Sequence, residues 1–243
     1  LILRAYLAFS RRSVSSYERA LQRRLREGKE DGARLGDRRG ETDAARPEGQ
    51  AIWFHAASVG ESVSLLELIR RICEDEPDAH ILVTTGTVTS AKMMDTRLPE
   101  RAQHQYVPMD AVPWVERFLD HWRPDLAIWT ESELWPALQS QTAERNIPML
   151  LINARMSQRS HDRWRLWPMR GVARTLLSLF QAAHVQDALT AGHLRRLGLP
   201  EERMEITGAL KEGAAALPHD EAERSELASQ FGGRPVWLAA STH

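Results

Sequence analysis

The chain has 243 residues, of which 42% are hydrophobic and 27% are charged, an ordinary composition for a globular protein. Its formal net charge of −1 at pH 7 argues against a general nucleic-acid binder. A single cysteine, Cys73, excludes a framework of internal disulfides. It falls on the apolar face of an expected helix, so we expect a buried, reduced thiol.

Residues 1–26 combine apolar residues at helical spacing with seven arginines and one acidic residue, Glu18. No apolar run reaches the roughly 18 to 20 residues that span a bilayer. The apolar residues precede the arginines, which is the reverse of a cleavable signal. The pattern predicts either a basic amphipathic helix that lies on an anionic membrane surface or a solvated helix packed on its own domain.

Residues 27–50 are rich in Gly, Asp and Arg, and we interpret them as a connector outside the core. From residue 51 onward, apolar runs alternate with helical patterns, which predicts an α/β fold with a parallel sheet and helices on both faces over residues 51–212. The expected strands are 52–54, 80–84, 105–108, 125–129, 148–152, 183–185 and 204–207, and the clearest helices are 65–72, 111–122 and 188–197.

The last thirty residues have a different pattern. Residues 213–222 are typical of a linker, and a helix at 221–231 and a strand at 235–240 are expected after it. A strand without a neighbour leaves a core incomplete. We therefore expect residues 213–243 to hold an interdomain linker and the first elements of a second α/β domain.

Polar side chains follow the ends of several expected strands. Because the carboxyl ends of parallel strands meet at one edge, where open α/β sheets bind ligands, we expect these side chains to lie together. The sequence contains no Ser/His/Asp order, metal-ligand spacing or Gly-rich nucleotide fingerprint, so no metal or cofactor is expected. Carboxylates, hydroxyls and cations around a cleft suit sugar and phosphate chemistry. The residues are His55, Ser58, Glu61, Thr84, Thr85, Thr87, Glu131, Glu133, Asn153, Arg155, Ser157 and Lys211.

Glu61 is the candidate general base. It is expected in or just before the first turn of a helix, where the helix dipole and free N–H groups favour the ionised carboxylate. The alternative is that Glu61 is an ordinary acidic first-turn residue. Scattered histidines such as His104, His121 and His161 are interpreted as surface or core residues rather than ligands.

Three segments together resemble motifs of the 3-deoxy-D-manno-octulosonic acid (Kdo) transferases of Gram-negative bacteria. They are HAASVGE at 55–61, TESELWP at 130–136 and NARMS at 153–157. The connector around residues 28–36 and the final ASTH, at 240–243, also resemble this family. The resemblance implies a GT-B glycosyltransferase with two Rossmann-like domains, of which this chain is the N-terminal, acceptor-binding half, cut at the start of the second domain.

The family resemblance also implies an activity and its location. Kdo would pass from CMP-Kdo to the 6′-hydroxyl of a lipid A precursor in lipopolysaccharide biosynthesis. The enzyme would act at the cytoplasmic face of the bacterial inner membrane, held peripherally or by its N-terminus. Glu61 aligns with the family's general base, and Glu131 and Lys211 match positions thought to stabilise the transition state. The acceptor cleft would be lined by Ser58, Gly60, Thr85, Ser132, Asn153 and Arg155.

Two alternatives from other classes remain open. One is a different GT-B enzyme, such as a nucleotide-sugar epimerase, which also places carboxylates in an interdomain cleft. The other is a non-catalytic membrane-binding module with a nucleotide-fold core.

The chain departs from the family pattern around Lys211. Residues 208–213 have the sequence GALKEG, where the family usually has GNLKFD.

Overall fold

The structure is a computed structural model that describes residues 1–131, 133–213 and 219–237. The chain divides into two units, Leu1–Gly213 and Ala214–His243. The second unit contains α11 (Glu221–Phe231), as expected. Residues 235–237 are not in a strand, contrary to expectation, and the rest of that expected strand and linker residues 214–218 lie outside the described residues.

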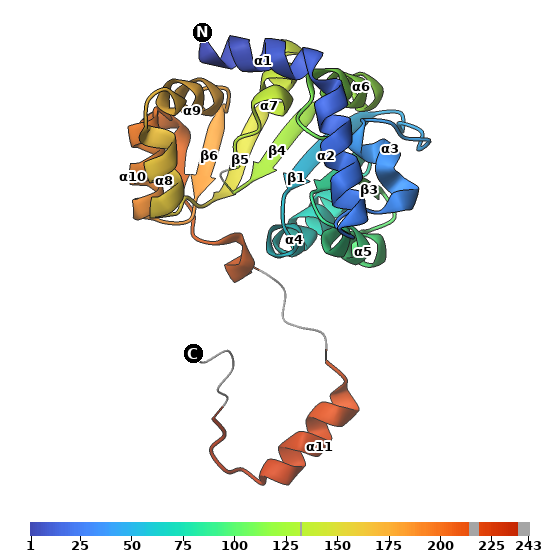
Figure 1. Cartoon of the computed structure of the whole chain (residues 1–243). Helices are drawn as coiled ribbons and strands as arrows, with labels where there is room; N and C mark the ends of the chain where they lie inside the picture. The colour runs from blue at the N-terminus through green and yellow to red at the C-terminus, as the bar shows by residue number, and fades with distance from the viewer. Residues whose placement is uncertain (132, 214–218, 238–243) are drawn as a thin grey trace. The chain divides into compact units, whose positions relative to one another are not determined.

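A parallel sheet of seven strands forms the centre of the first unit (Figure 1), in the order β3-β2-β1-β4-β5-β6-β7. Because β1 lies next to β4, the chain leaves these two strands toward opposite edges of the sheet. That arrangement opens a crevice at their carboxyl ends, which is where such sheets bind ligands. The strands are β1 (Gln50–Ala56), β2 (Ala79–Thr85), β3 (Ala102–Tyr106), β4 (Leu126–Thr130), β5 (Met149–Ala154), β6 (Ala182–Val185) and β7 (Met204–Ile206).

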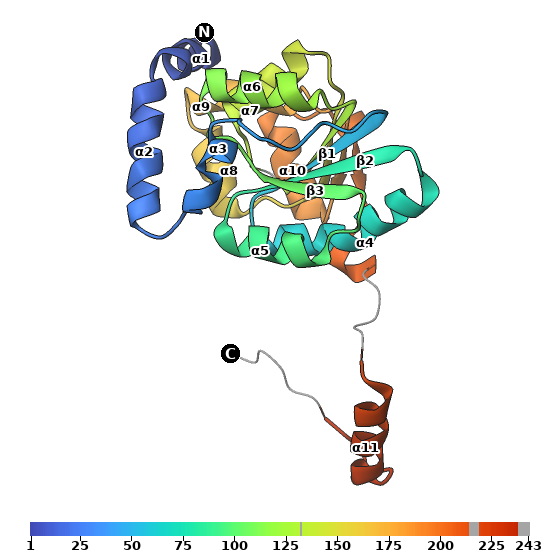
Figure 2. The same cartoon turned by 90° about the vertical axis from the view of Figure 1, so that its right-hand side faces the viewer.

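Helices cover both faces of the sheet (Figure 2), as the sequence predicts. Alternate residues of β1 point to opposite faces: Phe54 packs toward α4, and Trp53 packs against Trp129 and Phe118 in the larger core. Cys73 is buried in the α4 core, which confirms its predicted position. One face carries α4 (Val59–Asp75) and α5 (Val88–Arg97); the other carries α6 (Val112–Trp122), α7 (Pro136–Glu144), α9 (Met169–Leu177) and α10 (Ala188–Leu197), with α8 (Gln158–Arg165) against α9 and α10.

The basic N-terminal segment forms two helices rather than one, α1 (Ile2–Arg12) and α2 (Val14–Arg26), separated at Ser13. Both pack on the domain. Tyr6 of α1 joins the larger core, Ser10 Oγ donates to the Asp110 carbonyl at 2.8 Å, and Leu21 of α2 is fully buried. The inner faces of α1 and α2 therefore agree with the second alternative, a helix packed on its own domain. Within the described residues, no helix combines the length and the apolar character needed to cross a membrane.

Residues 27–50 add no buried residue to the three hydrophobic clusters, but the expected connector contains two buried charged residues, Glu30 and Arg38. This segment folds into η1 (Gly32–Arg34) and α3 (Leu35–Arg38), and the Arg38 side chain is only 5% exposed. Arg38 Nε lies 2.8 Å from Glu30 Oε2, and Arg38 Nη1 donates to the Val107 carbonyl at 2.9 Å. The many charged residues of this segment predicted a solvated loop. Arg38 and Glu30 are nevertheless buried, because they form an ion pair with each other.

All seven strands expected over residues 51–212 are present, each with bounds that differ from the prediction by one to three residues at one end or both. The strand expected at 105–108 occupies Ala102–Tyr106, and the one expected at 148–152 runs to Ala154. Asn153 therefore lies within β5, at an irregularity in its pairing with β6 between Leu151 and Ala154. Its φ of 52° is in the left-handed region, which Asn tolerates better than most residues. A local bulge of this kind leaves little trace in the hydrophobic pattern.

His55 was expected at the carboxyl edge of the sheet, but its side chain is buried below that edge. It is 1% exposed and packs edge-on against Trp129 and Trp135, with ring centroids 5.7 and 5.4 Å away. Burial, with a smaller contribution from the charge of Arg38, lowers the pKa of His55 to about 3. His55 is thus a neutral core residue at neutral pH.

This burial predicts a pH dependence of stability. In the unfolded chain His55 takes up a proton below about pH 6.5, whereas in the folded chain it does so only near pH 3. Its contribution to stability is therefore complete above about pH 6.5 and is lost as the pH falls toward 3, by about 2 kcal/mol between pH 6.5 and 5. Denaturant unfolding at pH 7 and pH 5 should show a smaller loss of stability for His55→Asn than for the wild type. Equal losses in the two proteins would contradict this prediction.

Candidate active site

Glu61 lies in the first turn of α4, directly above the β1–β4 crevice. The turn is capped by Ser58, whose Oγ lies 3.4 Å from the Glu61 amide nitrogen. Glu61 Oε2 accepts a hydrogen bond from the Ala57 amide at 2.9 Å and lies 3.2 Å from Thr130 Oγ1. Glu61 is therefore a first-turn carboxylate that completes a capping arrangement at the carboxyl ends of β1 and β4, and its function as a general base stays a prediction.

The two oxygens of the Glu61 carboxylate differ. Oε2 is held by two neighbours, from the β1–α4 loop and from the end of β4. Oε1 makes no hydrogen bond to any described residue. The residue is only 6% exposed, and its two contacts through Oε2 hold the carboxylate in one orientation. One anchored oxygen and one oxygen without a partner among the described residues would suit a positioned proton acceptor.

Glu131 follows β4 on the other side of the crevice. Its φ of 55° is left-handed, and its amide donates to the Ile152 carbonyl at 3.1 Å. Burial raises the pKa of Glu131, the negative charge of Glu61 raises it further, and Arg155 opposes both effects. The structure therefore brings Glu61, Glu131 and Arg155 into one electrostatic group, as the sequence predicts.

Two cavities flank this group and both include Glu133. One, of about 360 Å³, is polar and is lined by Glu131, Arg155 and Ser157. The other, of about 460 Å³, extends from the crevice toward α2 and is lined by Tyr17, Arg24, Arg38, Thr87 and Trp135, among others. The carboxylate edge thus opens into space on both sides, with basic groups on each.

Lys211 is exposed and lies in the short helix η3 (Leu210–Gly213), which follows β7. Asn153 holds the start of this helix. Its Oδ1 accepts from the Leu210 amide at 3.0 Å and from Gln186 Nε2 at 2.9 Å. Asn153 itself is 9% exposed; besides fixing the segment that carries Lys211, it lines a cavity of about 460 Å³ together with Leu210.

Replacing Asn153 by alanine is expected to release η3. The change removes the acceptor for the Leu210 amide, and one such hydrogen bond is worth about 1 kcal/mol. Hydrogen exchange at the Leu210 amide should become about fivefold to tenfold faster. Asn146→Ala is the matched control, because Asn146 also has a left-handed φ, of 56°, but is exposed and distant in sequence from this contact. Equal exchange in both variants would contradict the anchoring role.

The remaining predicted site residues differ in their surroundings. Ser58 and Gly60 are exposed at the start of α4, and a Cβ at Gly60 would meet no atom within 4 Å. Thr85 is fully buried, and its Oγ1 lies 2.9 Å from His104 Nε2, so it supports the rim from beneath. Ser132 lies outside the described residues.

Two residues of the site were missed by the sequence analysis. Thr130 Oγ1 contacts both Glu61 Oε2 and the His55 carbonyl, at 3.2 and 2.9 Å. Arg38 Nη2 donates to the Gly86 carbonyl at 2.5 Å and so ties the connector to the β2–α5 loop. Thr130 is the first residue of the motif at 130–136, but its sequence position gives it no function beyond ending a strand. For Arg38, no pattern in the neighbouring sequence indicates burial or a contact with the β2–α5 loop.

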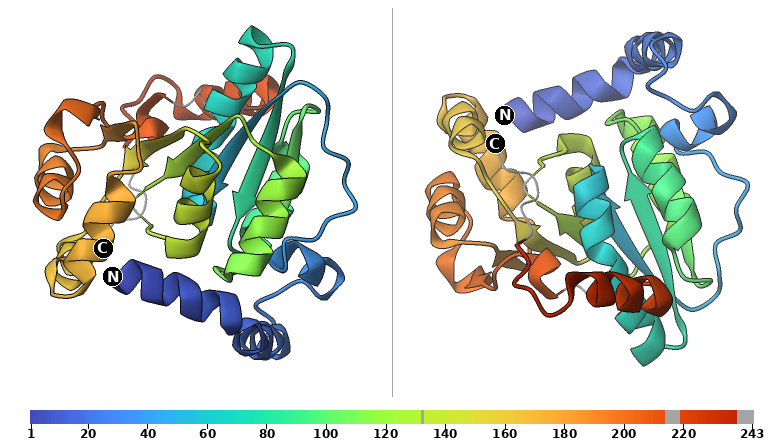
Figure 3. Two further views of the ribbon diagram at one scale, coloured as in Figure 1. Left: turned by 90° about the horizontal axis from the view of Figure 1, so that it is seen from above. Right: turned by 90° about the horizontal axis from the view of Figure 1, so that it is seen from below.

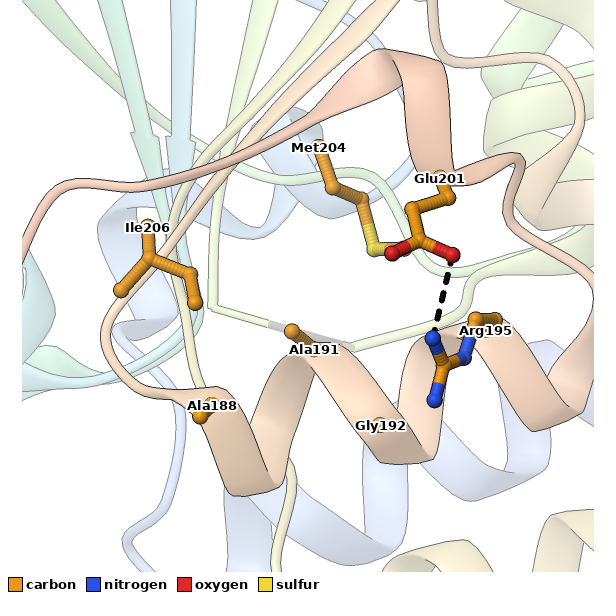
Figure 4. A pocket seen from close by; sticks show the side chains of 7 residues that line it. All are labelled: Ala188, Ala191, Gly192, Arg195, Glu201, Met204 and Ile206. Atoms are coloured by element: carbon orange, nitrogen blue, oxygen red, sulfur yellow. Dashed lines mark hydrogen bonds and ion pairs between the residues drawn. The ribbon is translucent and has the colours of Figure 1, made fainter.

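A further cavity, of about 290 Å³, lies between α10 and β7 (Figure 4). Its walls are mostly apolar, and the ion pair of Arg195 with Glu201, at 3.0 Å, lies at one end. None of the predicted site residues lines it. Within the described residues, no group of three or more His, Cys, Asp or Glu side chains is placed to hold a metal ion.

The parallel sheet, the β1–β4 crevice and the carboxylates at its edge define a Rossmann-like α/β domain of the GT-B type, which confirms the predicted fold class. A family model described as "3-Deoxy-D-manno-octulosonic-acid transferase (kdotransferase)" matches residues 33–214. The chain belongs to this family, and the resemblance inferred from its three motifs is confirmed.

Similar proteins support the same assignment. The 3-deoxy-D-manno-octulosonic acid transferase of Rickettsia bellii is 36% identical over 220 residues, which are 90% of this chain and 51% of the relative. The enzyme of the same name from Haemophilus influenzae is 34% identical over 209 residues, covering 83% and 47%. The chain therefore spans about half the length of the relatives that it matches.

A solved structure of a putative UDP-N-acetylglucosamine 2-epimerase from Listeria monocytogenes has a TM-score of 0.50 to this chain at 11% identity. The match covers 74% of this chain and 52% of the epimerase chain. At this identity the likeness shows a shared fold and does not favour an epimerase reaction.

Proposed function

We propose that the full-length protein transfers Kdo from CMP-Kdo to the 6′-hydroxyl of a lipid A precursor in lipopolysaccharide biosynthesis. Family membership supports the reaction class. The observation that carries the proposal is the Glu61 carboxylate, which is fixed through Oε2 at the β1–β4 crevice. This chain supplies the acceptor side of the reaction.

Glu61 acts as the general base in this proposal. Its Oε1 accepts the proton of the acceptor hydroxyl while the hydroxyl oxygen forms a bond to the anomeric carbon of Kdo. The bond from that carbon to the phosphate oxygen breaks, and CMP leaves with the bonding electrons. A positioned general base typically accelerates such a step by about 10²- to 10⁴-fold.

Lys211 and Glu131 assist charge rearrangement. Lys211, on η3, stabilises the negative charge that develops on the departing CMP. Glu131, whose pKa is raised by burial and by Glu61, orients the sugar or Lys211. Ser58, Gly60 and Arg155 contact the acceptor at the exposed part of the rim.

Membrane attachment completes the proposal, because the acceptor is a lipid. The inner faces of α1 and α2 pack on the domain, which leaves their outer arginines for anionic headgroups at the cytoplasmic face of the inner membrane. Arg4 and Arg12 are exposed on α1, and Arg19, Arg23 and Arg26 are exposed on α2.

Product analysis tests the reaction class. The full-length protein is incubated with CMP-Kdo and a tetraacylated lipid A precursor, and lipid-linked and free sugar are separated. Kdo on the lipid supports the proposal. Release of free sugar without a lipid product would favour hydrolase or epimerase chemistry, and lipid binding without turnover would favour a non-catalytic module.

A further inference from the structure

The turn between α8 and α9 exposes large apolar side chains. Leu166 is 59% exposed, Trp167 is 90% exposed and Met169 is 37% exposed. We call these three residues the turn surface. An isolated exposed leucine is ordinary, but three adjacent apolar side chains that include a nearly fully exposed tryptophan indicate a contact surface.

Basic residues surround the turn surface. Residues 158–174 contain five arginines and one acidic residue, Asp162. Asp162 pairs with Arg165 at 2.9 Å, while Arg163 and Arg170 are exposed on either side of the turn. This local excess of positive charge contrasts with the whole chain, whose formal net charge is −1.

A second surface of the same character lies on α1, a helix that contacts α9. On α1, Ile2 is 38% exposed and Phe9 is 60% exposed, and their spacing of seven residues places them on one face of the helix. Arg4 and Arg12 flank them. Helix α1 contacts α9, and its N-terminal end lies beside α9 in two views (Figures 1 and 3).

We propose that the turn surface is a second membrane contact, which inserts Trp167 and Leu166 into the headgroup region of an anionic bilayer beside α1. Tryptophan is favoured at this depth because its ring is largely apolar and its N–H can bond to headgroups or water. Arg163 and Arg170 match the negative surface charge, and each such side chain raises affinity by about fivefold. A contact at the turn surface, in addition to those of α1 and α2, would restrict the orientation of the domain on the membrane further than the two helices alone.

The inference extends the membrane attachment in the proposed function, but it can be tested without turnover. The full-length protein is sedimented with vesicles of phosphatidylcholine alone or with 30 mol% phosphatidylglycerol, a probe composition of about one anionic lipid in three. Leu166→Ser should weaken binding to the anionic vesicles by about tenfold. Leu189→Ser is the matched control, because Leu189 is 64% exposed on α10 and should bind as the wild type does.

Charge reversal provides an independent arm. Arg170→Glu should weaken binding to anionic vesicles by about tenfold or more, since it replaces an attraction by a repulsion. Arg97→Glu makes the same change at an exposed arginine at the end of α5, on the opposite face of the sheet, and should have a much smaller effect. Binding of the wild-type protein to the anionic vesicles should weaken as the salt concentration is raised, because salt screens the attraction between the arginines and the headgroups.

Fluorescence quenching identifies the inserted residue. Lipids brominated near the headgroup should quench wild-type tryptophan fluorescence, and Trp167→Phe should remove most of that quenching. Unchanged quenching, or equal binding of Leu166→Ser and Leu189→Ser, would overturn the inference. Self-association without lipid that Trp167→Ser abolishes would also overturn it, in favour of a second copy of the chain on the turn surface.

Transfer assays separate this inference from the proposed function. With the acceptor dispersed in detergent micelles, Trp167→Ser should keep the wild-type rate of Kdo transfer, because the turn surface lies outside the rim. A wild-type protein that transfers no Kdo would refute the proposed function and leave the vesicle result standing.

Discussion

Glu61→Gln is expected to slow Kdo transfer by about 10²- to 10⁴-fold with little change in folding. Glutamine retains an oxygen that can accept from the Ala57 amide and Thr130 Oγ1, so the capping contacts survive. It cannot take up the proton of the acceptor hydroxyl. Initial rates with CMP-Kdo and a tetraacylated lipid A precursor measure the loss, and acceptor binding should persist.

Glu133→Gln is the matched control for this prediction. Glu133 is an exposed carboxylate of the same rim that accepts a hydrogen bond from Trp135 Nε1 at 3.0 Å. We expect a rate within a few-fold of wild type, because its oxygen remains an acceptor for that bond. If Glu61→Gln were as active as Glu133→Gln, the function of Glu61 would be the structural one, closing the first turn of α4.

Arg38→Ala is expected to destabilise the protein by about 3 to 5 kcal/mol, as removal of one partner of a buried ion pair does. The Arg38 and Glu30 side chains are 5% and 1% exposed. With alanine at position 38, Arg24 would be the remaining ion-pair partner of the Glu30 carboxylate. The carbonyls of Val107 and Gly86 would also lose the hydrogen bonds that Arg38 donates. Urea unfolding followed by tryptophan fluorescence measures the change.

Arg39→Ala is the matched control, because Arg39 forms an ion pair with Glu18 at 2.7 Å that is partly exposed to solvent, at 27% and 35%. Such a pair contributes about 1 kcal/mol or less. Arg38→Lys should recover only part of the stability, since one ammonium group cannot reach all three acceptors that the guanidinium contacts. Equal destabilisation by Arg38→Ala and Arg39→Ala would show that burial of the Arg38–Glu30 pair carries no special weight.

The order of strands and helices was predictable because apolar runs and helical spacing are local properties of the sequence. The same logic placed Glu61 and Glu131 at one edge, since parallel strands share the direction in which they end. Family motifs then assigned roles to these carboxylates. Nothing local, however, indicated that β1 and β4 would be neighbours, and that pairing is what creates the crevice between the two residues.

The parts that could not be predicted depend on distant contacts. From the sequence, Arg38 is expected to be solvated. In the structure it donates hydrogen bonds to Glu30 and to the carbonyls of Val107 and Gly86. From the sequence, Asn153 is expected to follow a strand. In the structure it lies in an irregular part of β5, where its side-chain oxygen accepts a hydrogen bond from the Leu210 amide. The break between α1 and α2 falls at a serine, without the Pro or Gly that usually marks a helix end.

Asp110 links the N-terminal helix to the rim through one carboxylate. Its two oxygens accept from the backbone amides of Ala137 and Leu138 at the start of α7, and Oδ2 also accepts from Tyr6 of α1. Helix α7 begins immediately after the segment that contains Glu133 and Trp135. One carboxylate thus anchors both α1 and the first turn of α7, next to the candidate site. Disruption of α1 is therefore expected to disturb the rim at Glu133 and Trp135 as well.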